Sequence, residues 1–397
     1  MGGHWQILNV DRKEKKVSGG RKVKEIFRTD MSALYKSLRI PCLPKDVDRW
    51  LAHGPVVVQR KEIARLSAEI LDMIFRKILH DPEDYPGYNF IDCVSLALSC
   101  KQFLYVGQRH VLRSLVSFHG RAADCRLVCL GESAGPDDQA PSGMLTDAEL
   151  KEIADPDVPK VLPKGPFHNE EKEYEPVEAT RPRCLYSFAS AQYKPSDRVL
   201  DKLQRPLRNL CVDMHKREKR EGPVIDPRLA FDKHMVTVLG CAQYFPCPVY
   251  PDGPNALCNM SKGEYVLEDK LVALESLQGK IDLGHALLSR IFYSPGSNVP
   301  WAFGGDSEYD DQLAKGPWAG DRFRIAPANG LPELEDGKEW KDVTEEANKL
   351  LCHLWSVHDI AGDDYDTDSD VWDGEETVEL TGGQQVGNTL SAILEYV

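Results

Sequence analysis

The alternation of apolar and polar positions predicts a mixed α+β protein. Residues 4–17 form two short apolar stretches around a polar turn at 11–14, which is typical of a hairpin. Residues 22–39 repeat apolar positions at helical spacing. In the second half, the pattern predicts strands at 235–239 and 323–325, a hairpin at 256–266, and helices at 196–219, 283–292 and 344–355.

The strongest helical signal lies between residues 60 and 118. Ser67 is suited to an N-cap, and Glu69 lies in the first turn, where the helix dipole favours an acid. A polar loop is expected at 80–89, followed by a second helix from Ile91 and a third from Phe103. The first helix carries a wide apolar stripe of Ile70, Leu71, Ile74, Phe75, Ile78 and Leu79.

Two segments far apart in the chain share one pattern. Residues 8–14 and 258–264 each contain an Asn, an apolar residue, a basic turn and a Glu, and a Val follows each. The similarity has two explanations: one hairpin type is used twice, or the restricted chemistry of tight turns produces it by chance.

Charge divides the chain into segments. The formal net charge is -14 over 397 residues, but residues 1–45 carry +7, residues 131–180 carry -9 and residues 359–397 carry -11. The acidity therefore belongs to an expected linker, which has one short helix near 146–153, and to an expected disordered tail. The expected organisation is a basic hairpin and helix at 1–45, helices at 60–118, the acidic linker at 131–180, an α+β domain at 181–358 and the acidic tail at 359–397.

These features exclude several classes of protein. Nucleic-acid binding is not expected, because phosphate contacts need clustered Lys and Arg. No stretch has the roughly 20 uninterrupted apolar residues of a membrane span, and the N-terminus lacks the apolar core of a signal peptide. Eleven scattered cysteines without a C-x-x-C pair favour reduced thiols over a zinc site. We therefore expect a cytoplasmic or nuclear protein with no membrane partner.

Motifs for catalysis or cofactor binding are scarce. The sequence has no P-loop, G-x-G-x-x-G, G-x-S-x-G or H-E-x-x-H pattern, so neither a cofactor nor a catalytic residue is assigned. Residues 318–322 combine an aromatic residue, an acid and a base, which indicates either a pocket wall or a turn with an Asp–Arg pair. His285 is expected to be a satisfied, buried or half-buried residue of a helix.

The acidic tail contains one further pattern. Its aspartates and Glu375 match the ligand positions of an EF-hand loop, but Ser369 occupies the position that needs Gly for the sharp turn. A disordered acidic segment is therefore the preferred interpretation. The aspartates concerned are Asp364, Asp366, Asp368 and Asp370.

The helical segment resembles the F-box family. That family opens with Leu-Pro-x-Glu-Ile/Leu-Leu-x-x-Ile-Phe, and Ser67 departs from it where Pro is usual. The matching residues are Leu66, Glu69, Ile70, Leu71, Ile74 and Phe75. A second family pattern, Leu-x-Leu/Val-x-Cys-Lys-x-Phe/Trp, is matched by Leu96, Leu98, Cys100, Lys101 and Phe103. The match covers about 50 residues, and the arrangement is similar to that of fungal F-box domain-containing proteins.

The resemblance implies a non-catalytic adaptor function. In the family, the three helices dock on the small adaptor subunit of an SCF-type cullin–RING ubiquitin ligase, and the remaining chain binds a protein substrate. The alternative is a binding or scaffold protein whose F-box-like helices are internal core; an enzyme built on the C-terminal domain is a third possibility. Only the F-box interpretation expects an apolar edge that includes Leu66 and Phe75 to be accessible to solvent.

Overall fold

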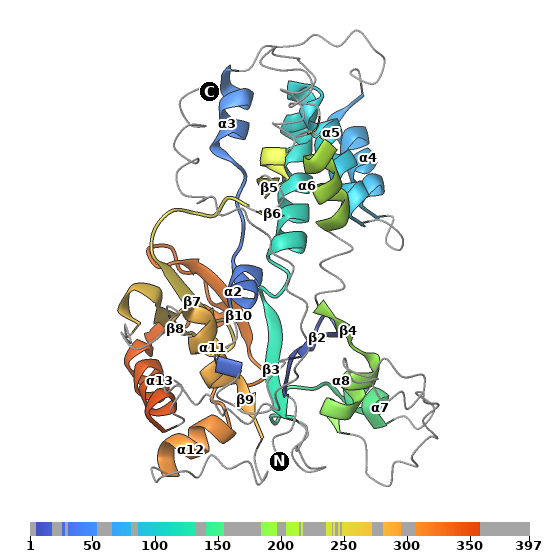
Figure 1. The fold of residues 1–397 in the computed structure, drawn as a ribbon. Coiled ribbons are helices and arrows are strands. Elements are labelled where there is room, and N and C mark those ends of the chain that lie inside the picture. Colours follow the sequence, from blue (N-terminus) through green and yellow to red (C-terminus); the bar gives the residue numbers. More distant parts are fainter. Residues whose placement is uncertain are drawn as a thin grey trace, which may run out of the picture. The chain divides into compact units, whose positions relative to one another are not determined.

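The computed structural model describes residues 5–17, 26–27, 31–53, 66–80, 86–131, 140–154, 184–196, 204–213, 216, 236–239, 241–242, 245–246, 248–271, 281–294 and 307–357. The mixed α+β class expected from the sequence is confirmed (Figure 1). The helices are α2 (Ser32–Leu38), α3 (Lys45–His53), α4 (Ala68–His80), α5 (Pro86–Leu98), α6 (Lys101–His119), α7 (Asp147–Ala154), α8 (Leu185–Gln192), α11 (Leu283–Ile291), α12 (Ser307–Ala314) and α13 (Thr344–Val357). Within these ranges, no helix has both the length and the apolar character that crossing a bilayer requires.

One mixed sheet joins strands from the beginning, middle and end of the chain. Its order is β11-β8-β7-β10-β3-β1-β2-β4, and β9 also pairs with β3. Six antiparallel strands form its centre, and the two-residue strands β4 and β11 pair in parallel at its edges. The strands are β1 (Trp5–Asn9), β2 (Glu14–Val17), β3 (Cys125–Gly131), β4 (Lys194–Pro195), β7 (Asn255–Asn259), β8 (Glu264–Leu267), β9 (Phe292–Tyr293), β10 (Arg322–Pro327) and β11 (Lys341–Asp342), beside a separate hairpin of β5 (Cys241–Ala242) and β6 (Phe245–Pro246).

The two halves of this sheet repeat each other's hydrogen bonds. Arg126 of β3 pairs with Arg322 of β10 at the centre. On one side the Val10 N–H donates to the Arg126 carbonyl over 3.1 Å, and on the other the Met260 N–H donates to the Arg322 carbonyl over 2.8 Å. At the two edges, the Lys194 N–H bonds to the Lys13 carbonyl and the Lys341 N–H to the Gly263 carbonyl. An approximate twofold relationship therefore runs between β3 and β10.

The hairpin similarity seen in the sequence is confirmed as one hairpin used twice. Asn9 pairs with Glu14 in the first hairpin, and Asn259 pairs with Glu264 in the second. The residue before each Glu has a left-handed backbone, with φ of 50° at Lys13 and 70° at Gly263. The shared pattern therefore encodes the same turn at both places.

Two apolar layers cover the sheet. Because successive strand residues point to opposite faces, Ile7 and Cys129 join one layer, whereas Leu8 and Val128 join the other. The first layer contains the predicted helices α11 and α13, and the second contains residues of α7 and α8. The prediction of a buried helix at 283–292 is confirmed by α11.

Residues 140–154, inside the segment expected to be a linker, pack against this sheet. Met144 and Ile153 are buried in the second layer. Thr146 and Glu149 bond to each other as the capping-box spacing predicts, with the Glu149 N–H donating to Thr146 Oγ1. Gly131 ends strand β3, and the other residues of that segment, 132–139 and 155–180, lie outside the described residues. So does the tail from residue 358, including its EF-hand-like pattern.

Several predicted boundaries differ in the structure. The strand expected at 235–239 is wrong, because residues 236–238 are helical. A short apolar run does not by itself distinguish a strand from a buried helical turn, and here tertiary packing decides. In the segment 22–39, residues 26–27 are helical, and α2 begins at Ser32, after the non-helical Met31. The loop expected at 80–89 is shorter, because Pro86 starts α5, a position that proline tolerates.

Candidate partner-binding surface

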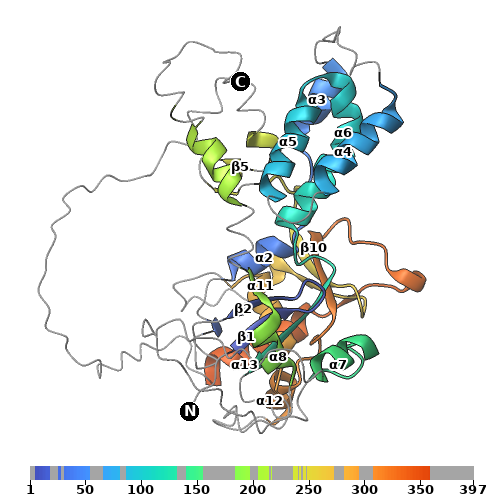
Figure 2. The ribbon, with the colours of Figure 1, turned by 90° about the vertical axis from the view of Figure 1, so that its right-hand side faces the viewer.

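The helices α4, α5 and α6 lie side by side and share one core (Figure 2). Leu71 and Phe75 of α4 and Phe103 of α6 are buried between them. Gly107 of α6 allows the close approach, since an added Cβ there would lie 2.6 Å from Phe75 Cζ. Four of the residues that match the F-box patterns are therefore core residues, namely Leu71, Phe75, Cys100 and Phe103.

The expectation that Phe75 is accessible to solvent is wrong. Its exposed fraction is 0%, and its ring stacks on His110 of α6 at 5.5 Å between centroids. The apolar stripe of α4 is wide enough to face both the core and the solvent, and the positions of α5 and α6 place Phe75 inside.

The other matching residues lie at or near the surface. Glu69 and Ile70 are exposed, and Ile70 is 43% accessible. The remaining matching residues are partly buried, namely Leu66, Ile74, Leu96, Leu98 and Lys101. The patterns thus contain both core positions and surface positions.

Leu66, Ile70 and Met73 form an apolar face on α4 and the residue preceding its cap; we call this surface the α4 face. Ile70 and Met73, three residues apart, lie along one side of α4, whereas Leu66 precedes the helix and packs half-buried against the core of the helical unit. Met73 is 62% exposed, although the family pattern leaves that position open. The i, i+3 spacing from Ile70 within the predicted helix was the sequence signal that could have identified it.

Tyr105 of α6 adds a second exposed apolar group, with an exposed fraction of 68%. It lies between Gln102 and Arg109 on its helix, at i−3 and i+4. The Gln102 amide donates to the Leu66 carbonyl over 3.3 Å, and Arg109 forms an ion pair with Asp72. Tyr105 therefore belongs to the side of α6 that meets α4.

A charged network holds α4 to α6 beneath this surface. Asp72 is buried, and its carboxylate contacts Arg76 at 2.6 Å, His110 Nε2 at 2.5 Å and the Arg109 guanidinium. The hydrogen bond from His110 and the neighbouring arginines hold the pKa of Asp72 below its ordinary value. The carboxylate is therefore charged at neutral pH, and it fixes the register of the two helices.

Ser67 directly precedes α4, the N-cap position that the sequence predicts, and its carbonyl accepts the Leu71 N–H over 3.1 Å. Glu69 is hydrogen-bonded to the Ser67 side chain, and this bond lowers the pKa of the Glu69 carboxyl. The helix start is thus stabilised locally, next to the α4 face.

Another side of the helical unit is covered by the chain itself. Val47 of α3 joins its core, together with residues of the helical segments 204–213 and 236–238. These residues are Leu207, Cys211, Val236, Val238 and, directly after the last segment, Leu239. The helical unit is therefore buried against its own chain on this side and exposed to solvent along the α4 face.

The other candidate groups from the sequence have structural partners. Asp321 accepts a bond from Asn259 over 2.8 Å and lies 3.4 Å from Lys262, while Arg322 pairs with Asp11. The Asp–Arg pair expected within 318–322 is therefore not formed. Burial raises the pKa of the Asp321 carboxyl.

His285 is the satisfied helix residue that the sequence predicts. Its Nδ1 lies 2.8 Å from the Asp282 carboxylate, at the N-cap of α11.

The thiols and acids of the described chain form no metal cluster. Nine cysteines of the described part of the chain are free thiols, and six of them are buried. Within the described ranges, no group of three or more His, Cys, Asp or Glu side chains could hold a metal ion.

No family model, no curated protein and no solved structure matches this chain.

Proposed function

We propose that this protein is an F-box-type adaptor that links a protein target to an SCF-type cullin–RING ubiquitin ligase. The α4 face carries the proposal. Ile70 and Met73 expose apolar side chains on a helix whose opposite side is fully packed, and exposed apolar surface of this kind is typical of a protein interface.

The resemblance of the sequence to the F-box patterns agrees with this arrangement. Leu71, Phe75 and Phe103 keep the three helices together, whereas Ile70 and Met73 remain accessible to a partner. An amphipathic helix that presents apolar residues at i and i+3 is a common way to fill an apolar groove. The partner would be the small adaptor subunit of the ligase.

Ubiquitin transfer belongs to the ligase partners in this proposal. The sheet and the helices α11 and α13 would serve as a rigid platform for binding a target. No cofactor is needed, and the protein would act in the cytoplasm or nucleus, where such ligases operate.

Two observations favour the scaffold alternative. Phe75, which the F-box interpretation expects to be accessible, is buried. The helical unit also buries a side against residues 204–213 and 236–239 of its own chain. In that alternative the helices are core, and the α4 face binds no ligase subunit. Only a binding experiment separates the two functions.

Co-expression with the ligase adaptor subunit tests the proposal. We expect the wild-type chain to co-purify, and an Ile70→Asp, Met73→Asp double variant to lose the subunit because two charges replace the apolar face. Leu150→Asp is the matched control, since Leu150 is an exposed apolar residue of α7. Circular dichroism checks that all variants fold. Failure of the folded wild type to bind would contradict the adaptor function.

A further inference from the structure

The exposed apolar surface of α4 continues onto α6. Gln102 contacts the Leu66 carbonyl and Arg109 contacts Asp72, so the two helices run in the same direction. Tyr105 lies between Gln102 and Arg109 and is 68% exposed, which places its ring beside the first turns of α4. The two helices therefore share one exposed apolar area, which consists of Ile70, Met73 and Tyr105.

Basic side chains adjoin this apolar area on both helices. Lys77 lies four residues after Met73 on α4, on the same side of that helix. On α6, Arg109 lies four residues after Tyr105, and Arg113 lies another four residues further on. Lys77, Arg109 and Arg113 are exposed. We call the apolar area together with these three residues the α4–α6 surface.

The positive charge of this surface is only partly compensated. Together, α4 and α6 carry five Lys and Arg but two Asp and Glu, although the whole chain has a net charge of -14. One carboxylate, that of Asp72, pairs with both Arg76 and Arg109. Within the described ranges, Lys77 and Arg113 form no ion pair. The surface therefore attracts negative charge next to apolar side chains.

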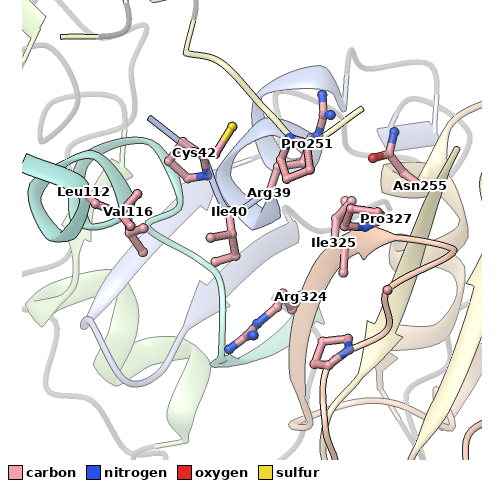
Figure 3. A pocket seen from close by; sticks show the side chains of 14 residues that line it. Arg39, Ile40, Cys42, Leu112, Val116, Pro251, Asn255, Arg324, Ile325 and Pro327 are labelled. Carbon is pink, nitrogen blue, oxygen red and sulfur yellow. The ribbon is translucent and has the colours of Figure 1, made fainter. Parts of the chain in front are cut away.

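The basic side of α6 ends where this helix meets the sheet. Leu112 and Val116, on the same side of α6 as Tyr105, are half-buried and line an apolar groove of about 330 Å³ together with Ile40 (Figure 3). The basic side of the helix thus extends from Lys101 to Arg113, about 18 Å at 1.5 Å per residue. A partner helix of about three turns matches this length.

We propose that the α4–α6 surface binds an acidic amphipathic helix of a partner protein. The apolar side chains of that helix contact the apolar area, and its carboxylates pair with Lys77, Arg109 and Arg113. This inference rests on the proposed function, and it states the chemistry of the segment that the ligase adaptor subunit presents to this chain. A helix has the matching shape, because the rows of side chains on two adjacent helices leave a furrow into which a third helix packs.

Two properties of the surface favour a protein helix over a nucleic acid. Ile70, Met73 and Tyr105 place apolar side chains at its centre, where they contribute nothing to contacts with phosphates. The uncompensated cations are also few, whereas binding to a phosphate backbone depends on many clustered Lys and Arg. Carboxylates beside apolar side chains are complementary to both parts of the surface.

Fluorescence polarisation with the purified full chain tests this binding, without any ligase subunit. The probe is a labelled helical peptide of about three turns, with Leu at i, i+3, i+4 and i+7 and Glu at the positions that flank the leucines. The comparison peptide has Lys in place of every Glu. We expect the acidic peptide to bind, and the basic peptide to bind at least about tenfold more weakly, because its charges are repelled.

A charge reversal locates the binding site. Lys77→Glu with Arg113→Glu is expected to weaken binding of the acidic peptide about tenfold or more and to strengthen binding of the basic peptide. A folding defect weakens both, so the gain identifies a direct charge contact. The matched control is Lys151→Glu with Lys338→Glu, which reverses two exposed lysines outside the helical unit and is expected to leave both affinities unchanged.

Three outcomes would overturn the proposal: no binding of the acidic peptide by the folded wild type, equal binding of the two peptides, or unchanged binding after the Lys77 and Arg113 reversal. A labelled DNA duplex that binds the wild type and is displaced by neither peptide would assign the cations to nucleic acid, and would also overturn it.

Co-purification with the ligase adaptor subunit separates this inference from the adaptor function. Co-purification that the Lys77 and Arg113 reversal leaves intact rejects the acidic helix and keeps the adaptor function. Binding of the acidic peptide without co-purification rejects the adaptor function and keeps the α4–α6 surface as a site for an acidic helix of another protein.

Discussion

Asn9 and Asn259 occupy the same position in the two hairpins of the sheet, and each accepts a backbone N–H from its own turn. Asn9 Oδ1 accepts from Arg12 over 3.1 Å, and Asn259 Oδ1 accepts from Lys262 over 3.0 Å. Each also pairs across the sheet with the corresponding residue of the neighbouring strand, Leu127 and Phe323. The twofold relationship of the sheet thus extends from its backbone to these side chains.

The two turns differ in how they tolerate substitution. Gly263 has φ of 70°, and an added Cβ would lie 2.8 Å from Leu334 Cδ1. Gly263→Ala is therefore expected to lower the free energy of unfolding by about 1–2 kcal/mol. Lys13→Gly, at the equivalent position, should change it by less than about 0.5 kcal/mol, because glycine adopts this backbone without strain. Urea unfolding measures the free energy of unfolding of both variants. A loss in Lys13→Gly as large as that in Gly263→Ala would contradict this prediction.

Substitutions of Phe75 and Met73 are expected to differ in their effect on the free energy of unfolding. Phe75→Ala leaves a cavity between α4 and α6 and should cost about 3–5 kcal/mol of unfolding free energy. Met73→Ala removes an exposed side chain and should change the unfolding free energy by less than about 0.5 kcal/mol. Chemical denaturation provides the comparison. A large loss in Met73→Ala would mean that the α4 face is covered within the chain.

We expect the folded state to lose stability in acid because of His119. Burial at the end of α6 lowers the pKa of this side chain to about 4, and its Nε2 donates to the Leu239 carbonyl at 3.3 Å. As pH falls from about 6.5 to 4, the unfolded chain takes up the proton first, so the folded state loses up to about 3 kcal/mol. His119→Leu should flatten this part of the stability profile. Unfolding at a series of pH values tests it, and an unchanged slope in the variant would exclude His119 as the cause.

Glu149 contributes in a lower pH range. Its hydrogen bonds to Arg126 lower the pKa of the carboxyl to about 2. The resulting stability is present at neutral pH and is lost as pH falls from about 4.5 to 2, because the unfolded chain becomes protonated first. Glu149→Gln should reduce the unfolding free energy by about 1 kcal/mol at pH 7, with a smaller difference near pH 2. A difference that stays constant across this range would contradict the role of the charge.

The local elements of this protein follow from residues close together in the sequence. The cap at Thr146 with Glu149, and the two turns after Asn9 and Asn259, depend on contacts within three to five residues. The apolar stripe of α4 likewise predicts its helix. These signals are short-range, so a single sequence contains all the information they need.

Only the tertiary structure decided which residues face a partner and which strands meet. The stripe of α4 does not show that Phe75 is buried while Ile70 and Met73 are exposed, because that depends on where α5 and α6 pack. The pairing of Arg126 with Arg322 joins strands almost 200 residues apart. Such contacts arise from burying several apolar faces at once, a condition that no local pattern specifies.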